Sequence, residues 1–357
     1  MTRLAIICDN HFGVRNDSPV FHEYFKRSLQ WFFDVLDKED IKTVIHLGDL
    51  FDRRKYLNFV TAQTCRKYFL EELNKRNIET HIITGNHDVY YKDTHEVNSL
   101  KEIVDNRYEY IKTYDHPTLL SIDDTKIQLI PWITDSNKDM SYEQIRNTPA
   151  DLLMGHFDIK GFELFKGTLS GHGDDSELFK RFDLVFSGHY HHKSSKGNIH
   201  YLGAFAEYTW SDWNDPRGFT IFDTKTRSFD LVRNPYSIFK VISYNDIKNV
   251  DIMKTINEMD YSQYKGTYVK VLCQKKENVY AFDMMMDKLY NAEPVDITVL
   301  EEEILLADTS TNDIDDIQDT PKILENYITC LTLPVNNDRM IIYMKDIHAE
   351  ALSTKFI

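Results

Sequence analysis

Seven side chains that carry oxygen or imidazole donors stand directly after short apolar runs of the sequence. They are Asp9, His11, Asp49, Asn86, His156, His189 and His191. None is a cysteine, and donors of this kind suit Mn²⁺, Fe or Zn²⁺ better than a soft metal. Seven ligands are too many for one ion, whereas two divalent ions that share a carboxylate would use all of them. Because such a pair holds the attacking and leaving oxygens of a phosphoester, the pattern predicts metal-assisted phosphoester hydrolysis.

We expect the carboxylate of Asp49 to bridge the two ions. The other ligands then form two sets, with Asp9, His11 and His191 on one ion and Asn86, His156 and His189 on the second. A water between the ions would have its pKa lowered enough to attack phosphorus as a metal-bound hydroxide. The imidazole of His87, next to Asn86, is well placed to protonate the departing oxygen, and the carboxylate of Asp52 could orient it. We expect Asp88 and Asp17 to be turn or capping residues.

The apolar runs that precede these motifs have the length of β-strands. They cover residues 4–8, 43–47, 80–84, 151–154 and 183–187. Runs that are apolar throughout are typical of strands buried on both faces of an α/β sheet. Amphipathic stretches at 21–38 and 59–76 separate the first three runs and suit crossover helices. Because the carboxyl ends of parallel strands open on one crevice, the loops that follow them should converge.

The sequence pattern changes after residue 200. Short alternating segments at 199–202, 219–223 and 228–232 indicate strands that close a second sheet. Asn234-Pro235 marks the end of a first domain, residues 1–235.

A smaller α+β unit is predicted at 239–300, with three strands and two helices, and could form a cap over the first domain. Residues 301–320 are acidic and have little to bury, which is typical of a linker. Residues 321–357 contain two amphipathic stretches at helical spacing. Two short helices cannot bury such a face alone, so we expect them to dock on a partner.

The chain has 357 residues and a formal net charge of −15, which argues against a general polyanion binder. Binding of nucleic acid would depend on local basic clusters, on bound cations or on a partner protein. No apolar run approaches the roughly 20 residues that span a bilayer, and the N-terminus lacks a secretory signal pattern, so we expect an intracellular protein. The four cysteines form no C-x-x-C pair, which argues against a disulfide framework.

The order of motifs D-x-H, G-D-x-x-D, G-N-H-D, G-H and G-H-x-H resembles the calcineurin-like metallophosphoesterase superfamily over the first 220 residues or so. Within it, the chain is most similar to SbcD-type nuclease subunits, and among these to the recombination endonuclease subunit of large tailed bacteriophages. Three features carry this closer resemblance: Arg53-Arg54-Lys55 after the second motif, Pro131-Trp132 after a strand, and a turn at 214–219 with the sequence NDPRGF. Archaeal and eukaryotic relatives place a second histidine where this chain has Asp52.

The resemblance implies a two-sheet α/β sandwich flanked by helices, a capping domain that binds DNA, and C-terminal helices that bind an SMC-like ABC ATPase. It also implies a homodimer, located in the host cytoplasm if the gene belongs to a phage. The implied activity is that of a DNA nuclease in double-strand-break repair and recombination, with 3′-to-5′ exonuclease and single-strand endonuclease functions. We expect two Mn²⁺ ions, with Mg²⁺ as the alternative.

Six basic residues in or near the ligand-bearing loops are candidates for DNA contact. They are Arg15, Arg53, Arg54, Lys55, Lys193 and Lys196. Two other functions compete with the nuclease: a metallophosphoesterase for non-DNA phosphoesters, and a DNA-end tethering scaffold with a vestigial site. The scaffold is disfavoured because a vestigial site should have lost ligands, and all seven are present.

Overall fold

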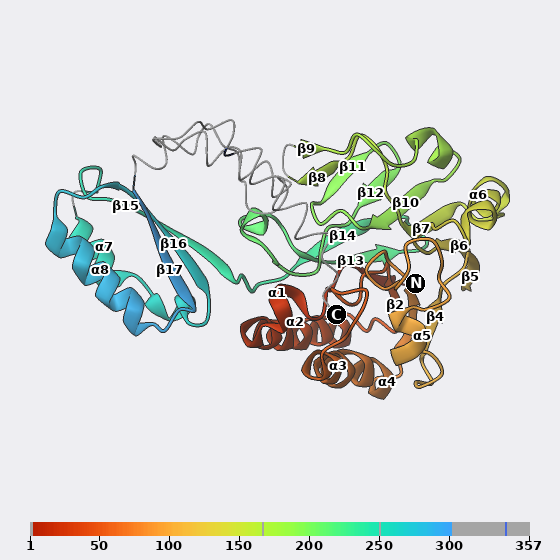
Figure 1. Ribbon diagram of the computed structural model, residues 1–357, viewed down its shortest axis with the longest axis horizontal. Helices are drawn as coiled ribbons and strands as arrows, with labels where there is room; N and C mark the ends of the chain where they lie inside the picture. The colour runs from red at the N-terminus through yellow and green to blue at the C-terminus, as the bar shows by residue number, and fades with distance from the viewer. Residues whose placement is uncertain (1–2, 166–167, 250, 302–339, 341–357) are drawn as a thin grey trace.

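Two six-stranded sheets lie face to face at the centre of the larger lobe of the molecule (Figure 1). The computed structural model describes residues 3–165, 168–249, 251–301 and 340. The first sheet has the order β14 (Phe229–Arg233), β13 (Gly218–Asp223), β1 (Arg3–Ile7), β2 (Thr43–His46), β3 (Glu79–Ile83) and β4 (Ile111–Tyr114). The second has the order β11 (Ser194–Lys196), β12 (Ile199–Tyr201), β10 (Leu184–Gly188), β7 (Leu152–His156), β6 (Thr125–Ile130) and β5 (Thr118–Ile122).

The strands that precede the predicted ligands are parallel within each sheet. In the first sheet β1, β2, β3 and β4 run parallel, and in the second β6, β7, β10 and β12 do so. The five predicted strands are therefore present, but they are divided between two sheets. Their carboxyl ends still meet at one edge of the sandwich, because ligand residues from both sheets are in hydrogen-bonding contact.

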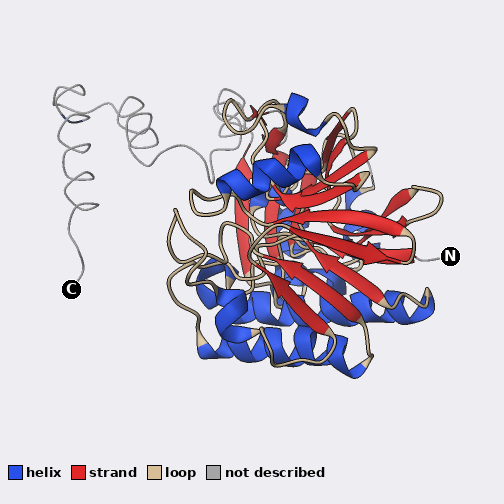
Figure 2. Ribbon diagram, turned by 90° about the vertical axis from the view of Figure 1, so that its right-hand side faces the viewer, coloured by secondary structure: helices blue, strands red, loops and turns tan. Residues whose placement is uncertain are grey.

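Alternation of side chains along each strand explains the layers. In β1 and just after it, Leu4, Ile6 and Cys8 pack into the core between the sheets, while Ala5 and Ile7 face the helices outside. Figure 2 shows helices stacked against the outer faces of the strands. The sandwich thus buries both faces of its central strands, as the continuous apolar runs predict.

Helices cover the outer face of the first sheet. They are α1 (Val14–Asp17), α2 (Pro19–Lys38), α3 (Phe59–Cys65), α4 (Glu71–Lys75) and α5 (Ser99–Ile103). Helix α2 begins with Pro19 in its first turn, where a missing N–H costs nothing, and buries Phe25, Leu29 and Phe32 on one stripe. The stretch predicted as one helix at 59–76 contains a π-helical segment, Arg66–Leu70, between α3 and α4.

A helix and a short hairpin lie on the side of the second sheet. Helix α6 (Lys138–Asn147) and the hairpin β8 (Glu163–Phe165) and β9 (Thr168–Leu169) belong to this side of the lobe. One prediction is wrong here: β13 and β14 do not close the second sheet, because β13 pairs antiparallel with β1 in the first. Of the three later strands predicted from the sequence, only β12 joins the second sheet.

The smaller lobe is built from β15 (Phe239–Asn245), α7 (Ile252–Glu258), β16 (Tyr268–Lys275), α8 (Val279–Asn291) and β17 (Asp296–Glu301). The predicted elements are all present, but the three strands are parallel, so this lobe is an α/β rather than an α+β unit. Phe239 packs on Trp210 of the larger lobe at a ring separation of 4.7 Å. The predicted linker and C-terminal helices lie outside the described residues, apart from Met340.

None of the helices that the structure describes is long and apolar enough to cross a membrane.

Candidate metal centre

The loops after β1, β2 and β10 hold several candidate ligands in an uncommon backbone conformation. Asp9, His11, Asp49 and His189 have φ values of 52°, 48°, 55° and 89°. Residues other than glycine rarely adopt positive φ, and each such residue costs of order 1–3 kcal/mol. Strained residues of this kind concentrate at functional sites, where the surrounding structure holds them in place. Four of the seven predicted ligands share this feature.

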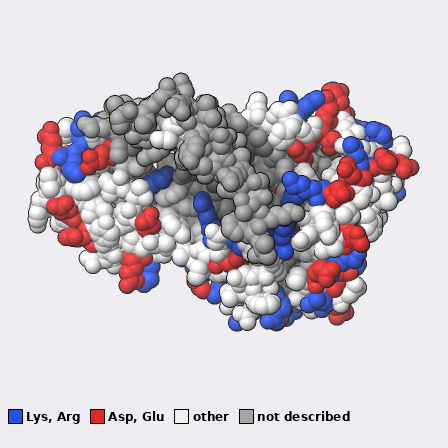
Figure 3. Space-filling model, viewed as in Figure 1, with Lys and Arg blue, Asp and Glu red and all other residues white. Residues whose placement is uncertain are grey.

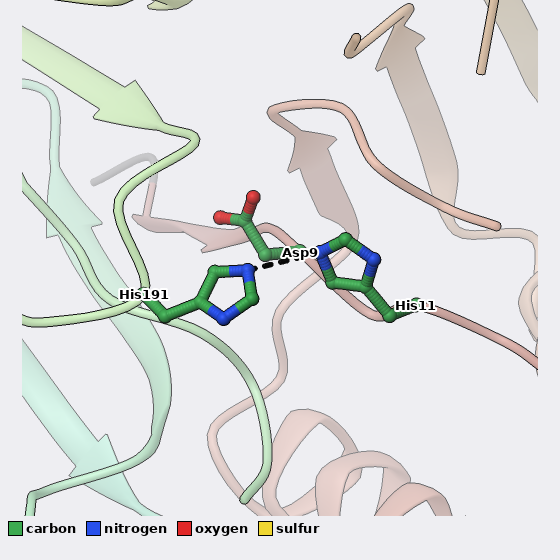
Figure 4. Close-up of side chains that lie close together, drawn as sticks. All are labelled: Asp9, His11 and His191. Carbon is green, nitrogen blue, oxygen red and sulfur yellow. Dashed lines mark hydrogen bonds between the residues drawn. The ribbon is translucent and has the colours of Figure 1, made fainter. Parts of the chain in front are cut away.

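Asp9, His11 and His191 form the first cluster (Figure 4). Each offers a ligand atom within 4.8 Å of the others, and the two imidazoles approach with Nε2 atoms 3.0 Å apart. The carboxylate of Asp9 also accepts a hydrogen bond from the main-chain N–H of His189, at 3.0 Å. The loops after β1 and β10 are thereby joined at this cluster.

Asn86, His156 and His189 form the second cluster. The side-chain oxygen of Asn86 lies 2.8 Å from Nε2 of His156 and 2.9 Å from Nδ1 of His189. His156 donates from Nδ1 to the main-chain carbonyl of Leu47 at 2.7 Å. Because that bond fixes the tautomer, the lone pair of its Nε2 faces Asn86 and is available to a metal.

Asp49 lies between the two clusters. Its Oδ2 atom is 3.6 Å from Nε2 of His11 and 3.5 Å from Nε2 of His156, while Oδ1 accepts from the main-chain N–H of His87 at 2.8 Å. The structure therefore brings together all seven predicted ligands in the two sets predicted from the sequence. The carboxylate of Asp49 lies within 3.6 Å of a histidine nitrogen from each set.

The electrostatics of the cluster fit a bound cation. Burial lowers the pKa of His11, but a hydrogen bond with Asp52 and the charges of Asp49 and other carboxylates outweigh it and raise that pKa to about 9. Burial opposes protonation of His156 as well, and Asp49 raises its pKa to about 9. Since the buried carboxylates stabilise positive charge at both imidazoles, divalent ions can take the place of those protons. These residues fit two metal ions that prefer oxygen and nitrogen ligands.

The other two imidazoles of the clusters, His189 and His191, have lowered pKa values. Burial, together with the charge of His156, lowers the pKa of His189 to about 3. Burial and the charge of His11 hold the pKa of His191 well below its usual range. Both are therefore neutral near pH 7, as metal coordination requires.

His87 and Asp52 interact differently from the sequence prediction. Nδ1 of His87 donates to the main-chain carbonyl of Asp52 at 2.5 Å, so the main chain rather than the carboxylate orients this imidazole. The carboxylate of Asp52 instead faces Nδ1 of His11, at 3.4 Å. The rings of His11 and His87 meet edge to face with centroids 4.8 Å apart, so His87 borders the first cluster. Asp52 is thus placed to orient a metal ligand.

Asp88 ties two ligand-bearing loops together. Its buried carboxylate accepts from the main-chain N–H groups of Leu50, Phe51 and Gly85 at 3.1, 3.2 and 2.9 Å. The prediction that Asp88 is a turn or capping residue is confirmed. The carboxylate of Asp17 has a different set of contacts and accepts from two side chains, the hydroxyl of Thr61 and the guanidinium of Arg53.

Two supporting residues were not predicted from the sequence. Arg217, in the NDPRGF turn, is buried, donates to the main-chain carbonyl of His191 and pairs with Asp212 at 2.5 Å. Tyr208 donates its hydroxyl to the main-chain carbonyls of Asp9 and Asn10. The NDPRGF turn contributed to the family resemblance, but no sequence signal connects either residue to the loops it supports.

The predicted DNA-contacting residues are placed as follows. Arg15 donates from Nε to the main-chain carbonyl of Tyr208 at 2.9 Å, close to the first cluster. Arg53 pairs with Asp17 at 3.1 Å and lies over the ring of Tyr56. Arg54, Lys55, Lys193 and Lys196 are exposed or half-buried. Figure 3 shows Lys and Arg side chains bordering the region between the two lobes.

A two-sheet α/β sandwich whose strand ends gather two sets of oxygen and imidazole donors around one carboxylate defines a metal-dependent phosphoesterase. Residues 2–193 match the family described as calcineurin-like phosphoesterase, and the chain belongs to that family.

Curated relatives cover most of the chain. Exonuclease subunit 1 of Enterobacteria phage T4 is 28% identical over 346 residues, which are 96% of this chain and 97% of that protein. A subunit of the nuclease SbcCD from Staphylococcus epidermidis is 26% identical over 75% of this chain and 79% of its own length. The corresponding SbcCD nuclease protein of Staphylococcus saprophyticus is 24% identical over 56% of this chain and 50% of its own length.

Proposed function

We propose that this protein is a metal-dependent DNA nuclease of a repair and recombination complex, with 3′-to-5′ exonuclease and single-strand endonuclease activity. The observation that carries the proposal is the position of Asp49, whose Oδ2 lies 3.5–3.6 Å from a histidine nitrogen of each cluster. The names of the relatives from phage T4 and Staphylococcus, an exonuclease subunit and nuclease subunits, support nucleic acid as the substrate.

Asp9, His11 and His191 would hold one ion and Asn86, His156 and His189 the second, with Asp49 shared. When bound, the two ions neutralise the charge of the phosphodiester and activate a water for attack. We propose Mn²⁺ as the metal. The chain's own residues fix the geometry of this centre: Asp52 faces His11, and the main chain of Leu47 fixes the tautomer of His156.

His87 is the proposed general acid. Its Nδ1 is committed to the carbonyl of Asp52, which leaves Nε2 as the nitrogen that donates a proton to the departing oxygen. Asp52 acts as a positioning residue, through its carbonyl on His87 and through its carboxylate on His11.

The proposal extends to domains and partners. Residues 1–235 would form the nuclease domain and 239–300 a cap that contacts DNA, with Arg15, Arg53, Arg54, Lys55, Lys193 and Lys196 as further contacts. The relatives are named as subunits, which supports a complex. We propose an SMC-like ATPase as the partner, bound through residues 321–357 after a linker at 301–320, and a homodimer of this chain in the host cytoplasm.

The test is cleavage of linear double-stranded DNA and circular single-stranded DNA by the purified chain with Mn²⁺, Mg²⁺ or EDTA. Asp49→Asn, which keeps the shape of the side chain but removes its charge, is the matched control. Bis-p-nitrophenyl phosphate reports the metal centre independently of DNA. We expect DNA cleavage that needs both Mn²⁺ and Asp49.

Two results would contradict the proposal. Hydrolysis of the small ester without DNA cleavage, also after addition of the partner ATPase, would indicate a phosphoesterase for other substrates. DNA binding without hydrolysis of either substrate would indicate a tethering scaffold.

A further inference from the structure

A cavity of about 290 Å³ opens beside the second metal cluster, where β6 and β7 end next to α6 at the right of Figure 1. His156 belongs both to the cluster and to the cavity wall, so the cavity adjoins the second set of predicted ligands. The volume is near the lower limit of small-molecule pockets, about 300–1,000 Å³. A nucleotide base and its sugar are of a size that fits this volume.

Trp132 forms the wall next to the metals. Its ring lies 5.1 Å from that of His189 and 5.9 Å from that of His156, between centroids. The side chain is half-buried, so part of the indole surface is open. The Pro131-Trp132 motif has no place in the metal chemistry, and the cavity gives its tryptophan a function.

The main chain of Trp132 is held on both sides. Its N–H donates to the carbonyl of Thr84 at 2.8 Å, two residues before the ligand Asn86. Its carbonyl accepts from His95 at 2.8 Å and from the side chain of Asn137 at 3.1 Å. An aromatic wall fixed to the ligand loop in this way is preorganised, which lowers the entropy cost of binding a flat ring.

The other walls offer polar partners of both kinds. Lys92 and Lys138 are exposed at the cavity, where they can approach carbonyl oxygens or phosphate. Asp158 and Asp174 also line the cavity and accept from Tyr190 and Tyr142, so their charge is partly satisfied by phenol hydroxyls. Each can accept a further hydrogen bond from a ring N–H. A ring that stacks, donates and accepts, and carries a phosphate, is a nucleotide base.

We propose that this cavity binds an unpaired nucleobase of the nucleotide next to the scissile phosphate, with Trp132 as the stacking surface. The proposal rests on the proposed nuclease function and specifies its substrate: the nucleotide at the cut is unpaired, so that its base can leave the duplex and stack on Trp132. Trp132 is then a binding residue that positions the phosphate over the metals.

The test measures the contribution of the base to binding at equilibrium. Thymidine 5′-monophosphate, thymidine 3′-monophosphate and 2-deoxyribose 5-phosphate are titrated into the full chain with Mn²⁺ by calorimetry. Trp132→Ala removes the ring and Trp132→Phe keeps a smaller one. Trp213→Ala is the matched control, because Trp213 is 43% exposed and lies outside the cavity.

We expect one thymidine nucleotide to bind at least about tenfold more tightly than deoxyribose phosphate, as stacking of one base predicts. The preference should disappear in Trp132→Ala and persist in Trp132→Phe and Trp213→Ala. Which nucleotide is preferred identifies the side of the scissile phosphate that the cavity serves.

Equal affinity for all three compounds in the unmodified chain, or a preference that survives Trp132→Ala, would overturn the proposal. The nuclease function is tested separately, by phosphodiester hydrolysis. The preference for a base is measured as equilibrium binding and does not depend on turnover.

Discussion

Replacing Gly85 with alanine should displace Asp49, the carboxylate that lies between the two ligand clusters and is proposed to serve both ions. Gly85 follows β3 and precedes Asn86, and a Cβ built on it would lie 2.2 Å from Oδ1 of Asp49 and 2.3 Å from the main-chain N of Asp49. Ordinary contact begins near 3.4 Å, so Asp49 must retreat by about 1.2 Å. Rotation of the side chain cannot relieve the contact with the main-chain nitrogen. The φ of Gly85 is outside the positive range, so the clash alone is the perturbation.

The expected loss is large because metal ligation tolerates little displacement. Ligand distances vary by only about 0.2 Å, and a misplacement of about 1 Å at an active site can cost on the order of 100-fold in rate. We therefore expect kcat/KM for bis-p-nitrophenyl phosphate with Mn²⁺ to fall at least about 100-fold. Mn²⁺ affinity, measured by calorimetry, should fall in parallel.

Gly171→Ala is the matched control, because a Cβ there would meet no atom within 4 Å. It should retain the affinity and the rate of the unmodified chain. Circular dichroism and urea unfolding without metal establish whether Gly85→Ala is folded. A folded Gly85→Ala protein with unchanged Mn²⁺ affinity and turnover would refute the assignment of Asp49 as the shared ligand.

Three further predictions concern the acid, the metals and the connection between lobes. His87→Ala should retain Mn²⁺ binding and lose about 10²–10⁴-fold in the rate of DNA cleavage. The rate on a p-nitrophenyl ester should fall less, because that leaving group needs no proton. Equal losses of rate on both substrates would argue against a general acid. Mn²⁺ at 1,000 times its Kd should raise the free energy of unfolding of the unmodified chain by about 4 kcal/mol, measured in urea. EDTA or Asp49→Asn should abolish this increase. An equal increase in Asp49→Asn would contradict the proposed site. Glu207→Ala should lower the free energy of unfolding by about 1–3 kcal/mol. The buried carboxylate accepts from the Ile238 and Phe239 N–H groups at 2.8 and 3.1 Å, and alanine leaves both donors without this acceptor. Unchanged unfolding in urea would show that this contact is dispensable.

The sequence predicts which side chains gather at the sheet edge, because their signal is local. Each apolar run ends where a buried strand ends, and the polar side chain that follows lies at the sheet edge whichever sheet the strand joins. The predicted division of the ligands into two sets around Asp49 agrees with the geometry for the same reason. The ligand roles themselves stay predictions until a metal is measured.

Partners of side chains in the loops were less predictable. The sequence places Asp52 near His87, but only the folded loop shows that its carbonyl meets His87 and its carboxylate meets His11. Every residue has a main-chain carbonyl, so no residue type indicates which carbonyl will accept a hydrogen bond from a histidine side chain. Strand pairing is also hard to predict from the sequence. The residues of β13 are predicted as a strand, but the partner strand β1 is more than 200 residues away along the chain.

Residue types and their periodicity over a few positions were enough to predict the buried strands of an α/β fold and the polar side chains that follow them, and the order of motifs was enough to indicate the family. Three features became visible only in the folded molecule: which sheet the later strands join, how Arg217 and Tyr208 hold the ligand loops, and that Trp132 lines a cavity at the second cluster. These features depend on contacts between segments far apart in the chain. Such contacts are set by the packing of whole layers, and short-range sequence patterns do not encode that packing.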